Sequence, residues 1–139
     1  MAAKGAPPPE GYVLAGGRGS FSTHNGPYYT RPGDRMLAEQ AFLALDRHAN
    51  GIGLVHGGML AAFMDGVLGG AVWRGCQQRA VTIHLSIDYL HMARVGEWVM
   101  GEGRMTRAAK DVAFAEGRAY VGGRDVVRCS GVFKLMNPR

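Results

Sequence analysis

Residues 58–75 read Gly-Met-Leu-Ala-Ala-Phe-Met-Asp-Gly-Val-Leu-Gly-Gly-Ala-Val-Trp-Arg-Gly, and this stretch predicts a helix that is apolar on nearly every side. Such a helix is buried inside a protein and does not lie on its surface. Its glycines each lower helix stability by about 1 kcal/mol relative to alanine. Burial of its large side chains, at roughly 1.5–3 kcal/mol each, must compensate. The rest of the chain therefore has to surround this helix.

Four strands are predicted after the helix. Residues 80–91 alternate apolar and polar side chains with period two, which is typical of a half-buried strand. Residues 97–106, 112–121 and 126–136 supply three more, and one face of the 112–121 strand is nearly all small residues. The connections between them are short, which favours antiparallel neighbours. We therefore expect a four-stranded antiparallel meander.

Small strand residues and helix glycines fit together if the sheet curls tightly around the helix. This combination predicts an α+β fold, a curled antiparallel β-sheet wrapped around one long central α-helix. Residues 39–47 are interpreted as a further strand, although helical spacing also fits them. The turn-rich residues 20–35 are expected to drape over the sheet, where they could close a pocket.

The chain has 139 residues, which suits one domain. We expect residues 1–19 to be a flexible Pro/Gly-rich leader and residues 20–139 to form that single domain. The start lacks the apolar run of a secretory signal, and Asp65 and several glycines interrupt the longest apolar stretch, so no membrane span is expected. Cys76 and Cys129 lack the spacing of metal or redox motifs. A cytoplasmic protein with reduced thiols is the simplest interpretation.

The formal net charge is +5. Its basic residues are scattered singly, without a basic run or a nucleic-acid motif, so we expect no nucleic-acid partner. A polyanionic small ligand is favoured over nucleic acid, and a merely solvated basic surface explains the charge equally well. His84 and Asp88 share a strand face, but a third ligand cannot be placed beside them. We therefore predict no metal and no cofactor.

Asp65 is the only ionisable residue between His56 and Arg74. A carboxylate in an apolar helix is costly unless it has partners. One interpretation is an acid/base or nucleophilic carboxylate that lines a pocket. The other is a buried aspartate that hydrogen-bonds backbone or caps a neighbouring element.

A glycine-rich segment, Asn50-Gly-Ile-Gly-Leu-Val-His-Gly-Gly58, precedes the helix. Gly57 and Gly58 would expose bare backbone N–H groups at the positive end of the helix, which suits a developing oxyanion. An ordinary glycine-rich turn is the alternative. Gly57 and Asp65 lie about 12 Å apart along the helix, too far to act on one group within one chain. A dimer with antiparallel helices would bring Gly57 of one subunit to Asp65 of the other.

The pattern from Asn50 through His56-Gly57-Gly58 to Asp65, followed by residues 81–89 and Gly96-Glu97, resembles the hotdog-fold acyl-CoA thioesterases. The most similar subgroup is the phenylacetate-pathway type, related to one class of 4-hydroxybenzoyl-CoA thioesterase. The resemblance covers roughly residues 22–136 and includes the segment 24–27. It implies the hotdog fold and hydrolysis of an acyl-CoA to CoA and a carboxylic acid, without identifying the acyl group.

The resemblance also implies roles for matching positions. Asp65 would be the general base or the nucleophile, and the Gly57 N–H would polarise the thioester carbonyl. His56 and Asn50 would position the thioester and the loop. Substrate-binding positions would be Gly58, Thr82, Tyr89, Arg107 and Lys110, and a solvated turn explains the last two equally well. A homodimer with shared active sites, assembled as a dimer of dimers, is expected.

Two alternatives differ in class. A hotdog hydratase or dehydratase would use a different histidine-centred motif, which this chain lacks. A non-catalytic acyl-CoA-binding protein would need an output module, for which 139 residues leave little room.

Overall fold

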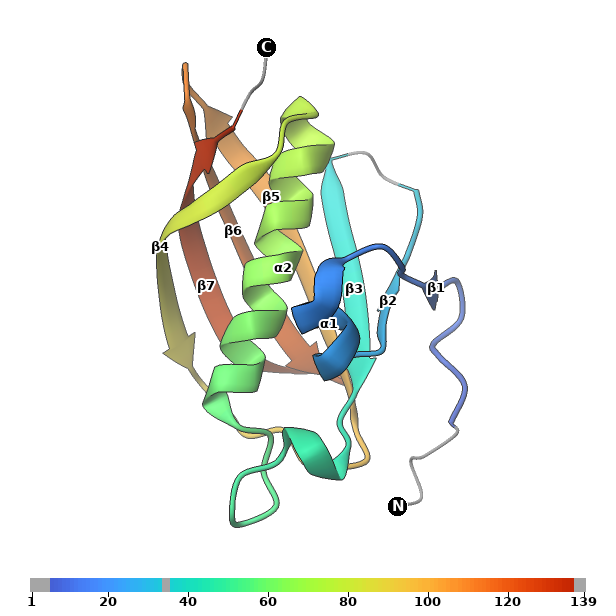
Figure 1. The fold of residues 1–139 in the computed structure, drawn as a ribbon. Helices are drawn as coiled ribbons and strands as arrows, with labels where there is room; N and C mark the ends of the chain where they lie inside the picture. Colours follow the sequence, from blue (N-terminus) through green and yellow to red (C-terminus); the bar gives the residue numbers. More distant parts are fainter. Residues whose placement is uncertain (1–5, 34–35, 137–139) are drawn as a thin grey trace.

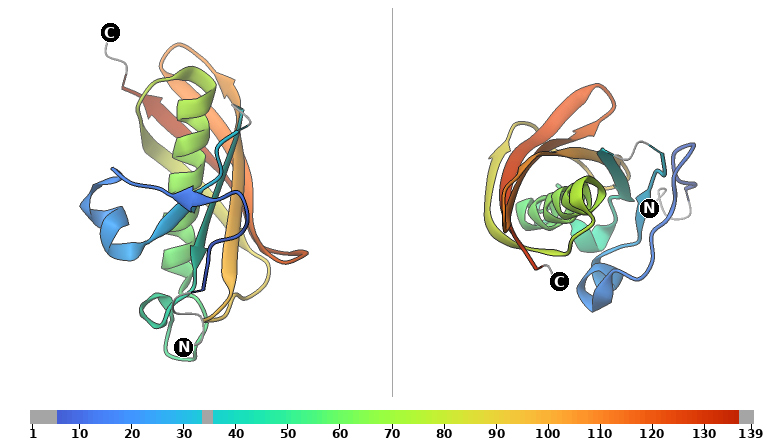
Figure 2. Two further views of the ribbon diagram at one scale, coloured as in Figure 1. Left: turned by 90° about the vertical axis from the view of Figure 1, so that its right-hand side faces the viewer. Right: turned by 90° about the horizontal axis from the view of Figure 1, so that it is seen from above.

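The computed structural model describes residues 6–33 and 36–136. In these residues, seven strands form one sheet with the order β1-β2-β3-β5-β6-β7-β4, and the sheet curls around the long helix α2 (Figures 1 and 2). The predicted α+β hotdog architecture is confirmed. The elements are β1 (Val13–Leu14), α1 (Gly19–Asn25), β2 (Tyr28–Thr30), β3 (Leu37–Leu43), the 3-10 helix η1 (Asp46–His48), α2 (Gly57–Cys76), β4 (Ala80–Tyr89), β5 (Trp98–Ala108), β6 (Val112–Val121) and β7 (Arg124–Leu135).

Helix α2 is the centre of the hydrophobic core, as its composition predicts. Its buried residues are Met59, Leu60, Phe63, Met64, Val67, Leu68, Ala71 and Val72. Gln77 ends the helix in a left-handed conformation, with its N–H bonded to the Trp73 carbonyl. None of the described helices is long and apolar enough to cross a membrane.

Glycines in the sheet allow the strands to approach the helix. A Cβ on Gly101 of β5 would lie 2.7 Å from the Phe63 ring, and one on Gly103 would lie 2.9 Å from Leu68. Real Cβ atoms do not make such short contacts, so side chains at these positions would push the sheet off α2. The small-faced strands therefore wrap the helix as expected.

The predicted four-stranded meander is wrong in one respect. Strands β5, β6 and β7 do form consecutive antiparallel pairs, but β4 pairs with β7 along residues 80–89 and not with β5. The short 90–97 connection runs past the N-terminal end of α2, where Arg94 bridges to Leu54. Because the sheet curls around α2, a short link past the end of the helix can join β4 to β5, although β7 and β6 lie between them in the sheet order (Figure 1).

Strand β4 is less buried than its alternating pattern predicts. Leu85 and Ile87 pack against the core, but Val81 and Ile83 are 52% and 58% exposed. The register with β7 shifts between Thr82 and His84. As the last strand in the sheet order, β4 leaves one edge unpaired and its outer apolar side chains uncovered within one chain.

The N-terminal third contains more regular structure than its turn-rich sequence predicts. Residues 19–25 form α1, which shares the lining of a pocket with α2, and residues 28–30 form β2 (Figure 1). The strand predicted at 39–47 is confirmed as β3, shifted to 37–43, with η1 in place of its end. Of the predicted leader, residues 1–5 lie outside the described residues, as do 34–35 of the turn-rich segment. Residues 13–14 pair with β2 as β1.

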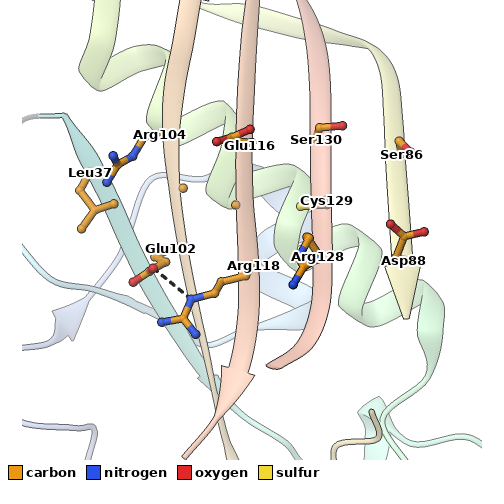
Figure 3. Close-up of a pocket in the computed structure, with 12 residues that line it drawn as sticks. Leu37, Ser86, Asp88, Glu102, Arg104, Glu116, Arg118, Arg128, Cys129 and Ser130 are labelled. Carbon is orange, nitrogen blue, oxygen red and sulfur yellow. Dashed lines mark hydrogen bonds and ion pairs between the residues drawn. The ribbon is translucent and has the colours of Figure 1, made fainter. Parts of the chain in front are cut away.

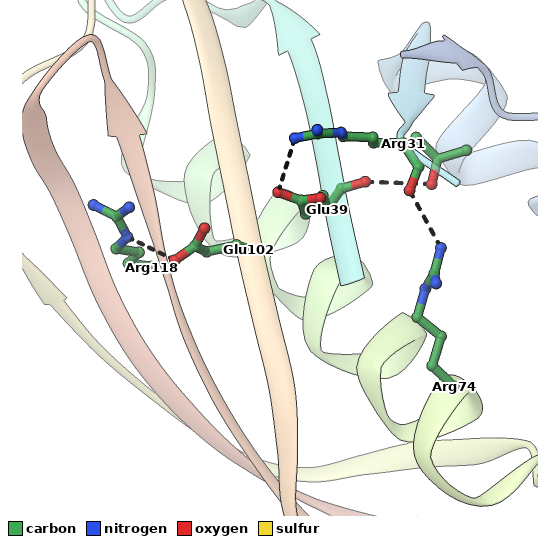
Figure 4. Close-up of polar contacts among 6 residues, drawn as sticks. Arg31, Glu39, Arg74, Glu102 and Arg118 are labelled. Carbon is green, nitrogen blue, oxygen red and sulfur yellow. Dashed lines mark hydrogen bonds and ion pairs between the residues drawn. The ribbon is translucent and has the colours of Figure 1, made fainter. Parts of the chain in front are cut away.

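Polar contacts tie this N-terminal layer to the rest of the fold (Figure 4). The Arg74 guanidinium of α2 donates to the Arg31 carbonyl at 3.5 Å, and the Arg31 side chain pairs with Glu39 of β3 at 3.7 Å. On the neighbouring strands, Arg118 pairs with Glu102 at 3.0 Å. These contacts hold β2 and β3 beside the C-terminal half of α2.

Candidate active site

Asp65 projects from the middle of α2 toward the start of β4. The Thr82 hydroxyl donates to the Asp65 Oδ1 atom at 2.5 Å, which orients the carboxylate. The other carboxylate oxygen accepts no hydrogen bond from the described residues. Asp65 is half-buried and lines two pockets. It therefore neither caps a helix nor bonds to backbone, and one oxygen is free to act on a bound molecule.

His56 caps the N-terminus of α2. Its Nδ1 atom accepts a hydrogen bond from the Gly58 N–H at 2.7 Å. The prediction that the Gly58 N–H is bare is therefore wrong. A Cβ on Gly58 would lie 2.9 Å from the same nitrogen, and glycine at 58 therefore allows the cap. The Gly57 N–H has no acceptor among the described residues. Of the two candidate oxyanion donors, only Gly57 is available.

Tyr89 and Asn50 surround this helix end. The Tyr89 hydroxyl donates to the Gly57 carbonyl at 2.8 Å, and a Cβ on Gly57 would lie 3.4 Å from the Tyr89 ring. The Asn50 Oδ1 atom accepts the N–H groups of Ile52 and Leu54 at 3.0 and 3.1 Å, which closes the loop before the helix. The structure thus gathers the predicted residues Asn50, His56, Gly57 and Tyr89 at one end of α2.

Asp65 and Thr82 form a second group within the same chain. Asp65 lies two helical turns along α2 from Gly57, about 12 Å by helix rise, and Thr82 of β4 lies against it. Arg107, near the end of β5, and Lys110, in the β5–β6 connection, form a third group. That hairpin lies at the C-terminal end of α2, where a Cβ on Gly75 would lie 2.6 Å from Met105. One chain alone therefore does not bring the predicted site residues together.

Two residues that the sequence did not single out hold this region. Buried His48 accepts the Leu45 N–H at 3.0 Å through Nδ1, so its Nε2–H donates to the Asn25 carbonyl at 2.7 Å. Its own carbonyl accepts the His56 N–H. Burial lowers the pKa of His48 below its ordinary value, against the opposing effect of the Asn25 hydrogen bond. No sequence pattern marks this histidine. Its neighbours Asp46 and Arg47 are charged, so the sequence gives no indication that His48 is buried.

Arg18 is the second such residue. Its Nη1 atom donates to Gln40 Oε1 at 3.1 Å, and Gln40 Nε2 donates to the Gly66 carbonyl at 3.4 Å. Burial lowers the pKa of Arg18, while the Tyr28 hydroxyl acts in the opposite direction. The sequence did not indicate Arg18 as a site residue, because it lies in the segment that was predicted to be a flexible leader.

Both Asp65 pockets include Arg18 and Gln40. One, of about 370 Å³, lies under α1 and includes Tyr28 and Leu85. The other, of about 900 Å³, follows α2 toward Trp73. A third groove, of about 470 Å³, lies on the sheet face opposite α2 and contains none of the predicted site residues (Figure 3). Among the described residues, no three His, Cys, Asp or Glu side chains are grouped to hold a metal ion.

The chain was compared with solved structures. A hypothetical thioesterase from Streptococcus pneumoniae solved with coenzyme A superposes with a TM-score of 0.73, at 18% identity, over 81% of this chain and 90% of that one. The PaaI protein from the phenylacetic acid degradation operon of E. coli also gives 0.73, at 17% identity, over 81% and 86%. At these identities the likeness shows the fold.

Sequence comparisons find relatives of higher identity than these solved structures. "Putative esterase PA0474" of Pseudomonas aeruginosa is 35% identical over 112 residues, covering 79% of this chain and 84% of that protein. Acyl-coenzyme A thioesterase 13 of Mus musculus is 29% identical over 73 residues, covering 50% and 51%. The model of the thioesterase superfamily matches residues 52–127, which include α2 with its N-terminal histidine and glycines. The chain therefore belongs to the thioesterase superfamily.

Proposed function

We propose that this protein hydrolyses acyl-CoA thioesters to CoA and a carboxylic acid, in a site that two subunits share. The observation that carries the proposal is the carboxylate of Asp65, which Thr82 holds through one oxygen at a pocket wall while the other stays free. The superfamily membership and the name of the mouse relative support the thioester as the bond that is cleaved.

The free oxygen of Asp65 can act in two ways. As a general base it takes a proton from water as the water oxygen bonds to the thioester carbon, and returns it to the CoA sulfur when the C–S bond breaks. As a nucleophile it bonds to that carbon itself, expels CoA thiolate and forms an anhydride that water then hydrolyses. The Thr82 hydrogen bond orients the carboxylate for either role.

The Gly57 N–H would stabilise the negative charge that develops on the thioester oxygen. It has no acceptor within the chain and lies at the positive end of α2. His56 supports this role by capping the neighbouring Gly58 N–H, which fixes the first turn of the helix. Asn50 and Tyr89 would hold the loop and the carbonyl of Gly57 in place.

A dimer would join the separated groups. If the α2 helices of two subunits pack antiparallel, Gly57 of one can face the partner subunit's Asp65. The uncovered apolar side chains and unpaired edge of β4, which carries Thr82, support this contact surface. Association of two such dimers would give the expected dimer of dimers.

The same arrangement gives Arg107 and Lys110 a role. They lie in the hairpin beside the C-terminal end of α2, which is roughly 16 Å from Asp65 along the helix axis. In an antiparallel pair, this hairpin of the subunit that supplies Asp65 lies past the Gly57 end of the other subunit. A CoA chain leaving the thioester in that direction would bring its phosphates to two cations that have no carboxylate partner among the described residues.

The test is a set of acyl-CoA thioesters of different chain length, with free thiol measured during the reaction. The wild-type protein should release thiol, and Asp65→Ala should lower turnover by at least ~100-fold, because a principal acid/base group is lost. Asp88→Ala is the matched control, since this exposed carboxylate lies on the outer face of β4.

Equal turnover in the Asp65→Ala variant would contradict the role of Asp65. If CoA esters bind and no thiol is released from any of them, the protein is a non-catalytic acyl-CoA-binding member of the fold.

A further inference from the structure

The pocket of about 370 Å³ under α1 contains a cation without a counter-ion. Among residues 6–33 and 36–136, no carboxylate oxygen lies within 4.0 Å of the Arg18 guanidinium. Its hydrogen-bond partner is the neutral amide of Gln40, which is itself buried. A partly buried charge normally has a partner of opposite sign. Arg18 therefore presents an unneutralised positive charge to this pocket.

Arg18 is held in place from several sides. The Gln40 side chain bridges it to the Gly66 carbonyl of α2, and its guanidinium lies 5.7 Å from the centre of the Tyr28 ring. A Cβ on Gly66 would lie 3.1 Å from Arg18 Nη2, so the glycine next to Asp65 makes room for the cation. The guanidinium is thus preorganised beside the candidate catalytic carboxylate.

Tyr28 supplies a second polar group. The residue is only 6% exposed and stacks on Phe63, yet its hydroxyl has no hydrogen-bond partner among the described residues. Every described side-chain oxygen that is sealed from solvent does have a partner, so the Tyr28 hydroxyl reaches open space. That space is the pocket, since Tyr28 lines it together with Arg18 and Ser22.

The remaining lining of the pocket is small or apolar, from Phe21, Ala61, Ala62, Phe63 and Leu85. An acyl chain whose thioester carbon lies at Asp65 would extend along this apolar lining. Its far end would meet Arg18 and Tyr28. Because Arg18 packs over the residue next to Asp65, this distance suits a short chain.

We infer that the pocket under α1 binds the acyl group, and that Arg18 and the Tyr28 hydroxyl select short acyl chains ending in a carboxylate. This inference rests on the proposed function. The carboxylate would supply the negative charge that Arg18 lacks and would accept a hydrogen bond from Tyr28. A plain alkyl chain would leave both groups unpaired when it displaces water from the pocket.

The test compares glutaryl-CoA with pentanoyl-CoA, which have the same number of acyl carbons and differ in the terminal carboxylate. The wild-type protein should favour glutaryl-CoA in kcat/KM by at least about tenfold, the scale of a hydrogen bond to a charged group. Arg18→Gln should remove this preference, and Arg18→Lys should retain part of it. Arg104→Gln, an exposed arginine on the opposite sheet face, is the charge-matched control and should keep the wild-type ratio.

Glycine variants test the geometry without changing charge. Gly66→Ala should reduce the preference by displacing the guanidinium, whereas Gly69→Ala, with nothing within 4 Å of its new Cβ, should not. Thermal unfolding of each variant shows whether it folds. A wild-type protein that cleaves pentanoyl-CoA at least as well as glutaryl-CoA would overturn the inference and leave the proposed function intact.

Binding measurements distinguish a failure of the proposed hydrolysis from a failure of the carboxylate pocket. The Asp65→Asn variant should bind glutaryl-CoA more tightly than pentanoyl-CoA by calorimetry, and the added Arg18→Gln change should abolish the difference. If wild-type protein cleaves neither these two esters nor any other thioester of the set but this Arg18-dependent difference is present, the proposed hydrolysis is wrong and the carboxylate pocket is supported. Equal binding of both esters would overturn the pocket.

Discussion

His48 connects three segments of the N-terminal layer through its ring and its backbone. Its ring nitrogens bond the Leu45 N–H and the Asn25 carbonyl, and its carbonyl bonds the His56 N–H. His56, which caps α2, is therefore held by a buried imidazole that must stay neutral, because its Nδ1 atom accepts a hydrogen bond from the Leu45 N–H. Local composition predicted Asp65 and Gly57 as candidate groups, and the family resemblance predicted Thr82. His48 and Arg18 carry no such signal, because their contacts with the Asn25 carbonyl and with Gln40 span 23 and 22 residues.

The neutral state of His48 predicts a pH dependence of stability. Burial lowers its pKa in the folded protein below the ordinary 6.5. Below that pH the unfolded chain binds more protons than the folded one, so the free energy of unfolding should fall as the pH drops from 7.5 to 5.5. Urea unfolding midpoints at the two pH values measure this.

The fall should be smaller in His48→Gln, which removes the titrating group, and unchanged in His24→Gln, which alters an exposed histidine of α1. An equal fall in the wild-type protein and in His48→Gln would show that other groups cause it.

At the scale of elements, the close packing of β5 and β6 around α2 depends on glycine. A Cβ on Gly117 of β6 would lie 2.2 Å from the Glu102 carbonyl oxygen of the paired strand. Backbone cannot move away without breaking the ladder that curves the sheet. The small face of residues 112–121 is visible in the sequence, and it correctly predicts a tightly curled sheet.

Gly117→Ala should therefore destabilise the protein by about 3 kcal/mol, at the upper end of overpacking effects. Gly123→Ala, in the β6–β7 turn with nothing within 4 Å of its new Cβ, should change stability by less than about 0.5 kcal/mol. Chemical denaturation of both variants measures the difference. Similar stabilities for the two would mean that the sheet relaxes around position 117.

At the scale of the whole molecule, the candidate site is incomplete in one chain. Gly57 and Asp65 lie about 12 Å apart along α2, and the 107–111 hairpin lies beside the C-terminal end of the helix, so the three cannot meet on one thioester. This separation predicts that two inactive variants can restore each other if subunits exchange. Gly57→Pro is a suitable partner for Asp65→Ala. Proline lacks the N–H, suits the first helical position, and tolerates the extended His56 before it.

Each variant alone should be inactive, and an equal mixture should recover about one quarter of wild-type activity. Random exchange makes half the dimers mixed, and each mixed dimer has one complete site of two. Thiol release after refolding the mixture measures the recovery. A mixture of Asp65→Ala with Thr82→Val is the control, because both changes affect the same half-site and no complete site can form. If the mixture with Gly57→Pro stays inactive, Gly57 and Asp65 do not complete one site across two subunits, and the shared site is contradicted.

The sequence by itself determined the buried helix and the curled antiparallel sheet, and it predicted Asp65 and Gly57 as the candidate groups for chemistry. Each depends on local composition or period, which a linear chain displays directly. Only the tertiary structure decided that β4 pairs with β7, that His56 caps Gly58 and leaves the Gly57 N–H free, and that Arg18 from the first 19 residues lies beside Asp65. Those outcomes depend on which distant segments share buried surface, and burial is a property of the whole packed chain.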